Sequence, residues 1–150
     1  MPYDKASLTS TAFGKLNPNQ HGVLPVLLVL QNESKQAIRL EQMKIEYIDA
    51  DRTRIDATPA ADVPFLYGPR RPNFNPSPIP GINLNRKKNP LAVPEIETRA
   101  FSAKMMPPAE SAHGFFYFQT PHRPGSKLYV TGLQNAATGK ELLYFEIPLD

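Results

Sequence analysis

The chain has 150 residues, enough for one domain with a hydrophobic core, and 41% of them are hydrophobic, which argues against wholesale disorder. It has no cysteine, which excludes disulfides, thiolate zinc sites and cysteine nucleophiles. Its net charge of +3 is too small to indicate a nucleic-acid partner by itself. With 17 prolines and 8 glycines, the composition argues against a helical bundle and favours strands joined by rigid loops.

Two strands are predicted in the N-terminal part. Residues 6–13 are rich in Ser and Thr and alternate weakly, which favours a first edge strand. Residues 23–30 are apolar on both faces and predict a second strand, with Pro25 near its start or at a bulge. This run is too short to span a bilayer, and the first residues lack the apolar core of a signal peptide. We therefore expect a cytoplasmic protein, or a periplasmic or exported one if a leader precedes Met1.

The next strand changes phase. Ile38 and Leu40 are apolar at even positions, whereas Met43 and Ile45 are apolar at odd ones. Because side chains alternate along a strand, one face cannot stay buried across this change, and a bulge or kink is predicted between Leu40 and Met43. Ile38 and Ile45 then both face inward. The spacing of Leu40, Met43 and Tyr47 also fits a helix, which stays open as the alternative.

Residues 59–95 are predicted to form a long, ordered, proline-rich insertion without regular structure, pinned by apolar residues such as Val63 and Leu91. Aromatic and cationic residues lie close together in it, and such pairs stack on bases or sugars and bind anions. The alternative, which we favour, is that the aromatics anchor the insertion and the cations face water. The candidate binding surface consists of Tyr67, Arg70, Arg71, Phe74, Arg86, Lys87 and Lys88.

The strongest strand signal is the segment 113–119, His-Gly-Phe-Phe-Tyr-Phe-Gln, in which four aromatic residues follow one another. Aromatic side chains fit a pleated surface, and a short run that is apolar on both faces predicts a strand at the centre of a sheet. We expect a packed layer on one side of this strand and partial cover on the other. Residues 23–30 should lie beside it or opposite it.

Further short strands are predicted over residues 55–58, 101–105, 127–131 and 143–149. In the last of these, the apolar residues from Leu143 to Leu149 are expected to face the core. Short strands at regular spacing, with turn signals between them, predict an all-β sandwich of seven or eight strands. The residues expected to be buried include Leu28, Phe116, Phe118, Val130 and Phe145.

Two segments, 107–118 (Pro-Pro-Ala-Glu-Ser-Ala-His-Gly-Phe-Phe-Tyr-Phe) and 29–38 (Val-Leu-Gln-Asn-Glu-Ser-Lys-Gln-Ala-Ile), resemble recurring features of certain bacterial cell-envelope domains. Those domains have no assigned function and an immunoglobulin-like or telokin-like β-sandwich. The resemblance leaves out the proline-rich insertion and transfers no catalytic residue. It implies an immunoglobulin-like β-sandwich, which we expect to form one domain over residues 1–150.

No motif for catalysis is found. The chain has no Gly-x-Ser-x-Gly elbow and no glycine-rich phosphate loop. Met105 and Met106 lie near His113, and thioether and imidazole are soft ligands that suit copper. The interpretation that we favour places Met105 in the core and Met106 at its rim. We therefore expect no metal, no cofactor and no enzymatic activity.

Two polar turns have a functional and a structural interpretation. Asp49, Asp51 and Asp56 surround one turn, but a calcium loop needs a glycine that is missing here, so a solvated turn is favoured. Asn32 begins an Asn-Glu-Ser sequence that fits a glycosylation acceptor. A polar hairpin turn explains the same residues.

We expect a non-catalytic accessory or protein-interaction domain of the bacterial cell envelope, whose partner is another protein or an envelope component. The alternative is a polyanion- or nucleic-acid-binding module that uses the basic insertion, and a hydrolytic enzyme ranks last. Salt dependence separates the first two, because polyanion binding weakens steeply as salt rises.

Overall fold

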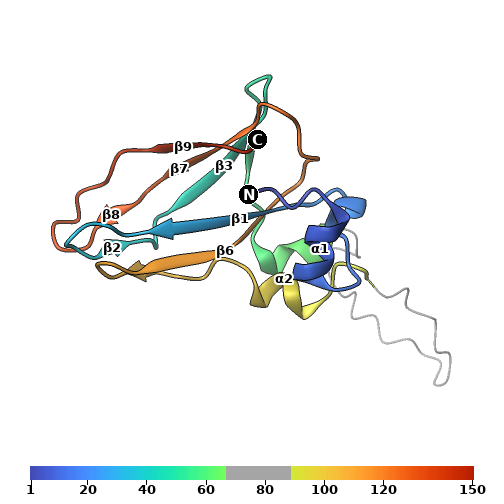
Figure 1. The fold of residues 1–150 in the computed structure, drawn as a ribbon, viewed down its shortest axis with the longest axis horizontal. Helices are drawn as coiled ribbons and strands as arrows, with labels where there is room; N and C mark the ends of the chain where they lie inside the picture. Colours follow the sequence, from blue (N-terminus) through green and yellow to red (C-terminus); the bar gives the residue numbers. More distant parts are fainter. Residues whose placement is uncertain (67–88) are drawn as a thin grey trace, which may run out of the picture.

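The computed structural model describes residues 1–66 and 89–150, and its strands form three antiparallel sheets (Figure 1). The mainly β fold expected from the sequence is confirmed, with nine strands among the described residues. None of the helices in this part of the chain combines the length and the apolar character needed to cross a membrane. The elements in chain order are α1 (Ala6–Phe13), η1 (Pro18–His21), β1 (Leu24–Gln31), β2 (Ile38–Arg39), β3 (Lys44–Ile48), β4 (Arg54–Asp56), η2 (Ala60–Leu66), α2 (Pro94–Thr98), β5 (Met105–Met106), β6 (Ser111–Phe118), β7 (Lys127–Thr131), β8 (Gln134–Asn135) and β9 (Phe145–Pro148).

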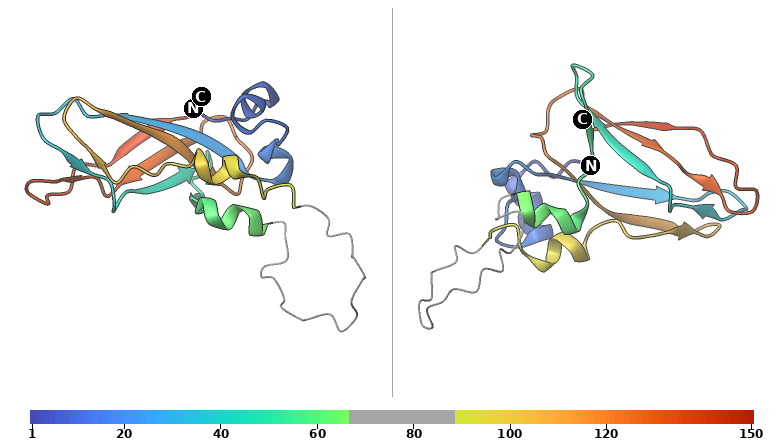
Figure 2. Two further views of the ribbon diagram at one scale, coloured as in Figure 1. Left: turned by 90° about the horizontal axis from the view of Figure 1, so that it is seen from below. Right: turned by 180° about the vertical axis from the view of Figure 1, so that it is seen from behind.

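Two layers of strands enclose the main core (Figures 1 and 2). One layer is the pair β1–β6, and the other is the four-stranded sheet in the order β4-β3-β7-β9. The third sheet, in the order β5-β2-β8, continues the fold at one end, because β2 and β8 extend the paired strands β3 and β7. Both layers contribute to the main core, which includes Leu24, Val26, Leu28, Ile45, Tyr47, Phe118, Leu128 and Val130.

The aromatic strand β6 pairs with β1 along its whole length, so residues 23–30 lie beside it, one of the two predicted positions. The prediction that β6 lies at the centre of a sheet is wrong, because β1 and β6 form a two-stranded sheet and β6 otherwise makes only isolated bridges, at Tyr117 and Phe115, among the described residues. Phe118 faces the main core, whereas Phe115 and Tyr117 belong to a second core that lies under α1, α2 and η2. Figure 2 shows these helices grouped at one end of the β1–β6 pair. Val29 and His113, farther along the same outer face, are exposed. The expectation of a packed layer on one side and partial cover on the other is therefore confirmed.

Pro25 is tolerated near the start of β1 because its nitrogen faces away from β6. The backbone groups of Pro25 and Leu27 point to the other edge of β1, where the first residues of the chain pair with them. Tyr3 N–H donates to Pro25 O at 2.9 Å, and Met1 and Leu27 exchange bonds of 2.8 and 2.9 Å. A proline at such an outward-facing position removes no ladder bond with the neighbouring strand.

The strand predicted over residues 6–13 is wrong, because this segment forms α1. Thr9, Ala12 and Phe13 are buried on one face, at the spacing of three and four that suits a helix. The hydroxyl groups bond to backbone carbonyls one turn back, and Thr11 Oγ1 donates to Ser7 O at 3.0 Å. A weak alternation of small polar residues therefore concealed a helical pattern.

The predicted kink between Leu40 and Met43 is confirmed, in the form of a tight turn between β2 and β3. Met43 N–H donates to Leu40 O at 3.0 Å, and the isoleucines on both sides of the turn pack into the main core. The neighbouring strand bends at the same point, at Gly132, which has a φ of 77°. A Cβ on Gly132 would lie 1.9 Å from Gln42 O, so the two bends fit together only with glycine here.

The predicted burial is confirmed for Leu28, Phe118 and Val130, whereas Phe116 is half-buried. For Phe145 the prediction is wrong, because this side chain is 48% exposed. Phe145 does lie on the inward face, since it pairs with buried Val130 on β7. It stays exposed because β9 is the edge of its sheet.

Two other burial predictions are wrong. Leu143 precedes the edge strand and is 84% exposed. Met105 is exposed and Met106 is buried, which reverses the predicted roles. The reason is that the chain crosses between layers here: Phe101 N–H bonds to Phe115 O in one layer, and β5 pairs with β2 in another sheet. The crossing interrupts the alternation that the sequence suggested.

The first described end of the proline-rich insertion is helical rather than irregular, since it forms η2. At the second described end, residues 89–93 are irregular, as predicted, and α2 begins at Pro94. Val63 and Leu91 are fully buried, as predicted for anchors. Asn89 Nδ2 donates to Pro64 O, and Asn89 Oδ1 accepts from Leu91 N–H at 3.1 Å. The two ends are therefore tied to each other and to the second core.

Candidate binding surfaces

The binding surface predicted from the sequence falls outside the described residues. All its members belong to the segment 67–88: Tyr67, Arg70, Arg71, Phe74, Arg86, Lys87 and Lys88.

The described histidines are not grouped into a metal site. Among residues 1–66 and 89–150, no group of three His, Asp or Glu side chains is placed to hold a metal ion. His122 Nδ1 lies 3.4 Å from Ser126 Oγ, but Ser126 is only 1% exposed and is out of reach of a substrate. Met106 faces the main core, whereas His113 is exposed, so the two soft ligands are not brought together.

The turn with the aspartates is structural, and it is less solvated than predicted. Asp49 is buried, accepts a hydrogen bond of 2.7 Å from Ala50 N–H, and forms an ion pair of 3.0 Å with Arg123. Asp51 is exposed, and the hydrogen bond from Thr53 N–H lowers the pKa of its carboxyl group. These carboxylates hold the turn and a neighbouring loop in place.

The side of the main core between β1 and β9 is open. Each of these strands is an outer strand of its layer. The edge of β1 that the first residues of the chain cover at Pro25 and Leu27 continues at Val29 and Gln31. Neither of these two has a strand partner on that edge among the described residues. Their backbone N–H and C=O groups are therefore available to an added strand.

A pocket of about 150 Å³ opens into the main core between these two edges. Three of its lining residues, Met106, Val130 and Leu133, are buried core residues, so the pocket reaches from the surface to the main core. An apolar cavity of this volume holds a group of about the size of a benzene ring. The lining consists of Leu30, Gln31, Ile38, Met106, Val130, Leu133, Leu142, Phe145 and Ile147.

The exposed face of Phe145 indicates that this side lacks a covering element. Inward-facing side chains of facing sheets normally interdigitate and bury each other. Phe145 faces the space between the layers and is nevertheless about half exposed, and Leu30 and Ile147 beside it are only half-buried. An apolar surface of this kind is typical of a site where another chain binds.

The edge of β9 is poorly suited to receive a strand. Leu149 N–H donates to Ser126 O, so that the alternate residues Glu146 and Pro148 turn their backbone groups toward the outer edge. Pro148 has no N–H to donate, and Glu146 carries a charge. Both features discourage pairing at an edge, so the edge of β1 is the one that remains open to a partner.

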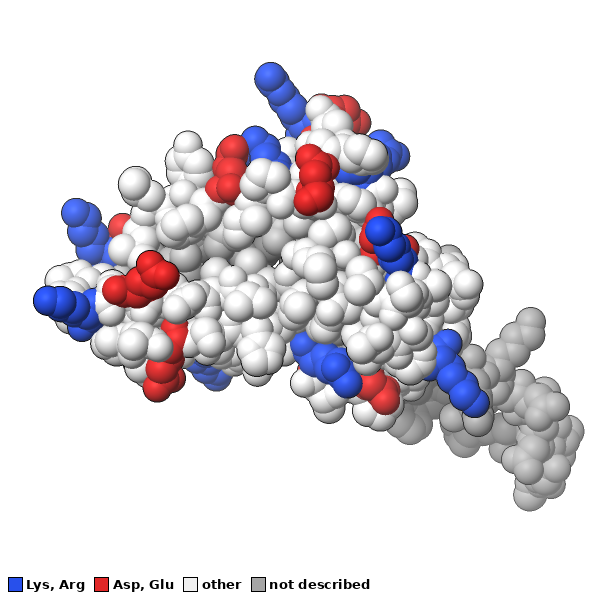
Figure 3. Space-filling model, in the orientation of Figure 1, with Lys and Arg blue, Asp and Glu red and all other residues white. Residues whose placement is uncertain are grey.

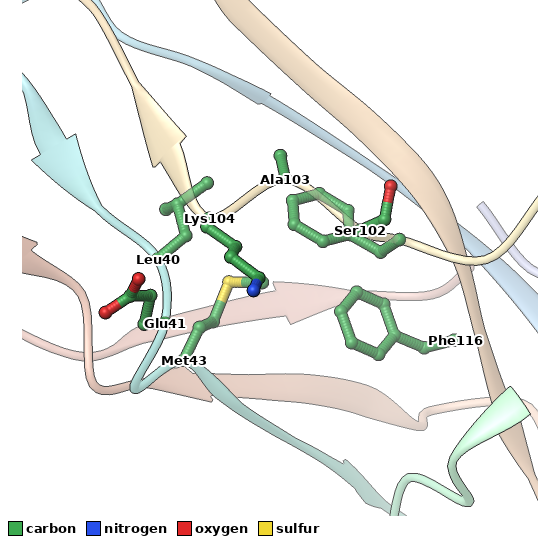
Figure 4. A pocket seen from close by; sticks show the side chains of 8 residues that line it. Leu40, Glu41, Met43, Ser102, Ala103, Lys104 and Phe116 are labelled. Carbon is green, nitrogen blue, oxygen red and sulfur yellow. The ribbon is translucent and has the colours of Figure 1, made fainter. Parts of the chain in front are cut away.

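A second hollow, of about 380 Å³, lies on the other side of the main core, between the turn at 40–43 and the segment 101–104 (Figure 4). Its floor is aromatic, with the rings of Phe101 and Phe116 stacked at a centroid distance of 5.3 Å. Figure 4 shows the side chain of Lys104 extending across the hollow toward Met43. This hollow explains the half-burial of Phe116.

A third hollow, of about 360 Å³, lies on the outer face of the β1–β6 pair, beside α1 and α2. Its floor is apolar, and its walls carry two basic side chains and several hydroxyl groups. The lining consists of Tyr3, Thr11, Ala12, Leu27, Thr98, Arg99, Ala100, Ser102, His113, Gly114 and Phe115.

The outer face of the four-stranded sheet carries ion pairs at its surface. They are Lys44–Asp56 at 3.1 Å, Arg54–Glu46 at 3.2 Å and Lys127–Glu146 at 2.7 Å. Figure 3 shows charges of both signs interspersed over the face in view, with the band between β9 and β1 mostly uncharged. The described residues on the face shown in Figure 3 therefore form no broad basic patch, and the open side between β1 and β9 is apolar.

The open side combines residues 29–31 with residues 142–147, which are far apart in the sequence. The sequence held one signal for this open side, because the apolar alternation of the last strand ends in a proline, and proline suits an edge strand.

Comparisons of the chain with protein-family models, with curated proteins and with solved structures found no significant match.

Proposed function

We propose that this protein is a non-catalytic interaction module that holds an extended segment of another protein in the open side between β1 and β9. The observation that carries the proposal is Phe145, an inward-facing aromatic side chain that is 48% exposed beside a pocket into the core. A protein that worked alone would gain stability by covering this residue.

The bound segment adds a strand to the edge of β1. It pairs with Val29 and Gln31 and continues the ladder that Met1 and Tyr3 begin on the same edge. One apolar side chain of the segment enters the pocket of about 150 Å³ and covers Phe145. In this mode of recognition the backbone bonds supply affinity and the side-chain pocket supplies specificity. The preferred segment is extended and has apolar residues at alternate positions.

An immunoglobulin-like sandwich and a place in the bacterial cell envelope belong to the same proposal. Two facing antiparallel layers support the first, together with a segment that bonds to β6 near Phe101 and to β2 at Met105–Met106. The resemblance of residues 29–38 and 107–118 to cell-envelope domains supports the second. The polyanion-binding alternative stays a prediction, since its cations lie outside the described residues.

Selection of a phage-displayed library of random peptides on the intact protein tests the proposed function. We expect the enriched peptides to share apolar residues at alternate positions. We expect Phe145→Glu to weaken their binding about tenfold or more, because an anchoring contact to an interface aromatic contributes at least that much affinity.

Phe65→Glu is the matched control, because Phe65 is 46% exposed and lies in η2, outside the open side. This variant should bind the selected peptides as the unchanged protein does. Equal weakening by both variants, or enriched peptides without apolar alternation, would contradict the proposed function.

A further inference from the structure

The hollow on the outer face of the β1–β6 pair has an apolar floor that other side chains hold in place. Leu27 and Phe115 form this floor, and Phe115 belongs to the second core. Tyr3 packs against Phe115 edge to face, with ring centroids 4.7 Å apart. Phe13 lies on the same ring at 5.1 Å. The floor is therefore a fixed aromatic surface, and it shares no residue with the pocket between β1 and β9.

Two basic side chains at this hollow have no acidic partner among the described residues. Arg99 and His113 line it, and both are exposed. Neither makes an ion pair or a side-chain hydrogen bond with the described residues, not even Arg99 with Glu95 one turn earlier. Within residues 1–66 and 89–150, no acidic side chain lines the hollow. The polar wall thus offers cationic and neutral donors without a neutralising charge.

The wall that carries Arg99 is fixed to the sheet. Phe115 N–H donates to Arg99 O at 2.9 Å, and Phe101 N–H donates to Phe115 O at 3.0 Å. The chain can approach this closely because residue 114 is a glycine, where a Cβ would lie 2.4 Å from Phe101 Cα. The backbone of this wall is therefore ordered before a ligand binds, so that binding has to order only the side chains.

We propose that this hollow binds a small organic carboxylate that carries an apolar ring or chain. The carboxylate accepts hydrogen bonds from the Arg99 guanidinium, whose planar fork matches carboxylate geometry, and from the His113 ring. The apolar part lies on Phe115 and Leu27. The volume of about 360 Å³ falls within the range of small-molecule sites and has room for both parts. This site does not depend on the proposed peptide-binding function.

Titration of the ¹⁵N-labelled protein by NMR, with benzoate as the probe, tests the proposal. We expect saturable shifts of the amides of Arg99, His113 and Gly114. Inorganic phosphate, which has the charge without the ring, and benzyl alcohol, which has the ring without the charge, should each bind more weakly than benzoate. Binding of either one as tight as that of benzoate, or shifts by benzoate that do not saturate, would overturn the proposal.

The variants Arg99→Gln and Arg52→Gln separate recognition from a general effect of charge. Arg99→Gln should weaken benzoate binding about tenfold, since a hydrogen bond to a charged group contributes about that factor. Arg52→Gln removes the same charge from the exposed turn between β3 and β4, and should leave benzoate affinity unchanged. Equal affinities of the two variants for benzoate would overturn the assignment of Arg99.

Discussion

Asn32 joins parts of the chain that are far apart in the sequence. Its Nδ2 group donates to Gln36 O at 2.8 Å and to Met106 O and Pro107 O at 3.0 Å. Its Oδ1 accepts from Ser34 N–H at 3.0 Å. The side chain is 1% exposed, so its amide takes the place of water for these backbone carbonyls. A glycan on this nitrogen would break the network, which supports the polar-turn interpretation.

Replacing Asn32 with Ala should lower the free energy of unfolding by about 3 kcal/mol, because buried carbonyls lose their donor. Urea denaturation measures this loss. Asn135→Ala is the control, since Asn135 caps a hairpin turn by accepting from Ala137 N–H at 2.9 Å and is more accessible. We expect a loss of about 1 kcal/mol there. Equal losses in the two variants would mean that the buried amide of Asn32 stabilises the protein no more than the accessible amide of Asn135 does.

Tyr117 gives the stability of the protein a dependence on high pH. Its hydroxyl group donates to Ile96 O at 2.7 Å, and burial raises the pKa of this phenol. A pKa raised by folding contributes stability that is complete below the unfolded pKa of about 10 and is lost as the pH rises above it. Between about pH 10 and pH 12, the unchanged protein should therefore lose stability partly through Tyr117.

Tyr117→Phe should lower the free energy of unfolding near neutral pH by about 1 kcal/mol, because it loses the bond to Ile96 O. It should also make the decline above about pH 10 shallower, since the phenol no longer ionises on unfolding. Urea denaturation at a series of pH values measures both effects. The same slope in both proteins would show that Tyr117 does not control this decline.

The paired bends of two neighbouring strands depend on one glycine. Gly132→Ala meets two penalties, a φ of 77° and a Cβ placed 1.9 Å from Gln42 O. We expect a loss of roughly 3 kcal/mol or more in the free energy of unfolding. Gly139→Ala is the control, because Gly139 has a φ of 69° but nothing within 4 Å of its Cβ position. It should cost only about 1 kcal/mol.

Denaturant unfolding of the two glycine variants separates the backbone penalty from the contact with the turn at residues 40–43. If Gly132→Ala were no worse than Gly139→Ala, the two bends would not be packed against each other as the structure has them.

The sequence predicted correctly those elements that are determined by the residues within the element itself. β1, β6 and β7 were predicted because short runs of apolar or alternating residues favour strands over other structures. The kink before Met43 was predicted because the apolar residues change from even to odd positions there. α1 was missed because its Ser and Thr side chains satisfy their hydroxyl groups within the helix. The exposure of Phe145 was missed because alternation reveals which way a side chain faces and not what lies opposite it.

At the scale of the whole molecule, the open side depends on which strands lie at the edges of the two layers. Val29 carries no mark in the sequence that it lies at an edge, and Phe145 has only the nearby Pro148, since edge position depends on pairing between distant segments. The functional surface predicted in the insertion was inferred from residue types rather than from strand pairing, and it lies outside the described residues. A surface formed by the absence of a neighbouring strand is the hardest kind to predict from residue patterns.

Hydrogen exchange of the backbone amides of β1 tests the open side most directly. Leu28 and Leu30 turn their N–H groups toward β6, whereas Val29 and Gln31 turn theirs outward. In the free protein, the amides of Leu28 and Leu30 should exchange slowly and those of Val29 and Gln31 rapidly. With a selected peptide bound, the amides of Val29 and Gln31 should become protected as well. Slow exchange of these two amides in the free monomer, or unchanged rapid exchange with the peptide bound, would contradict it.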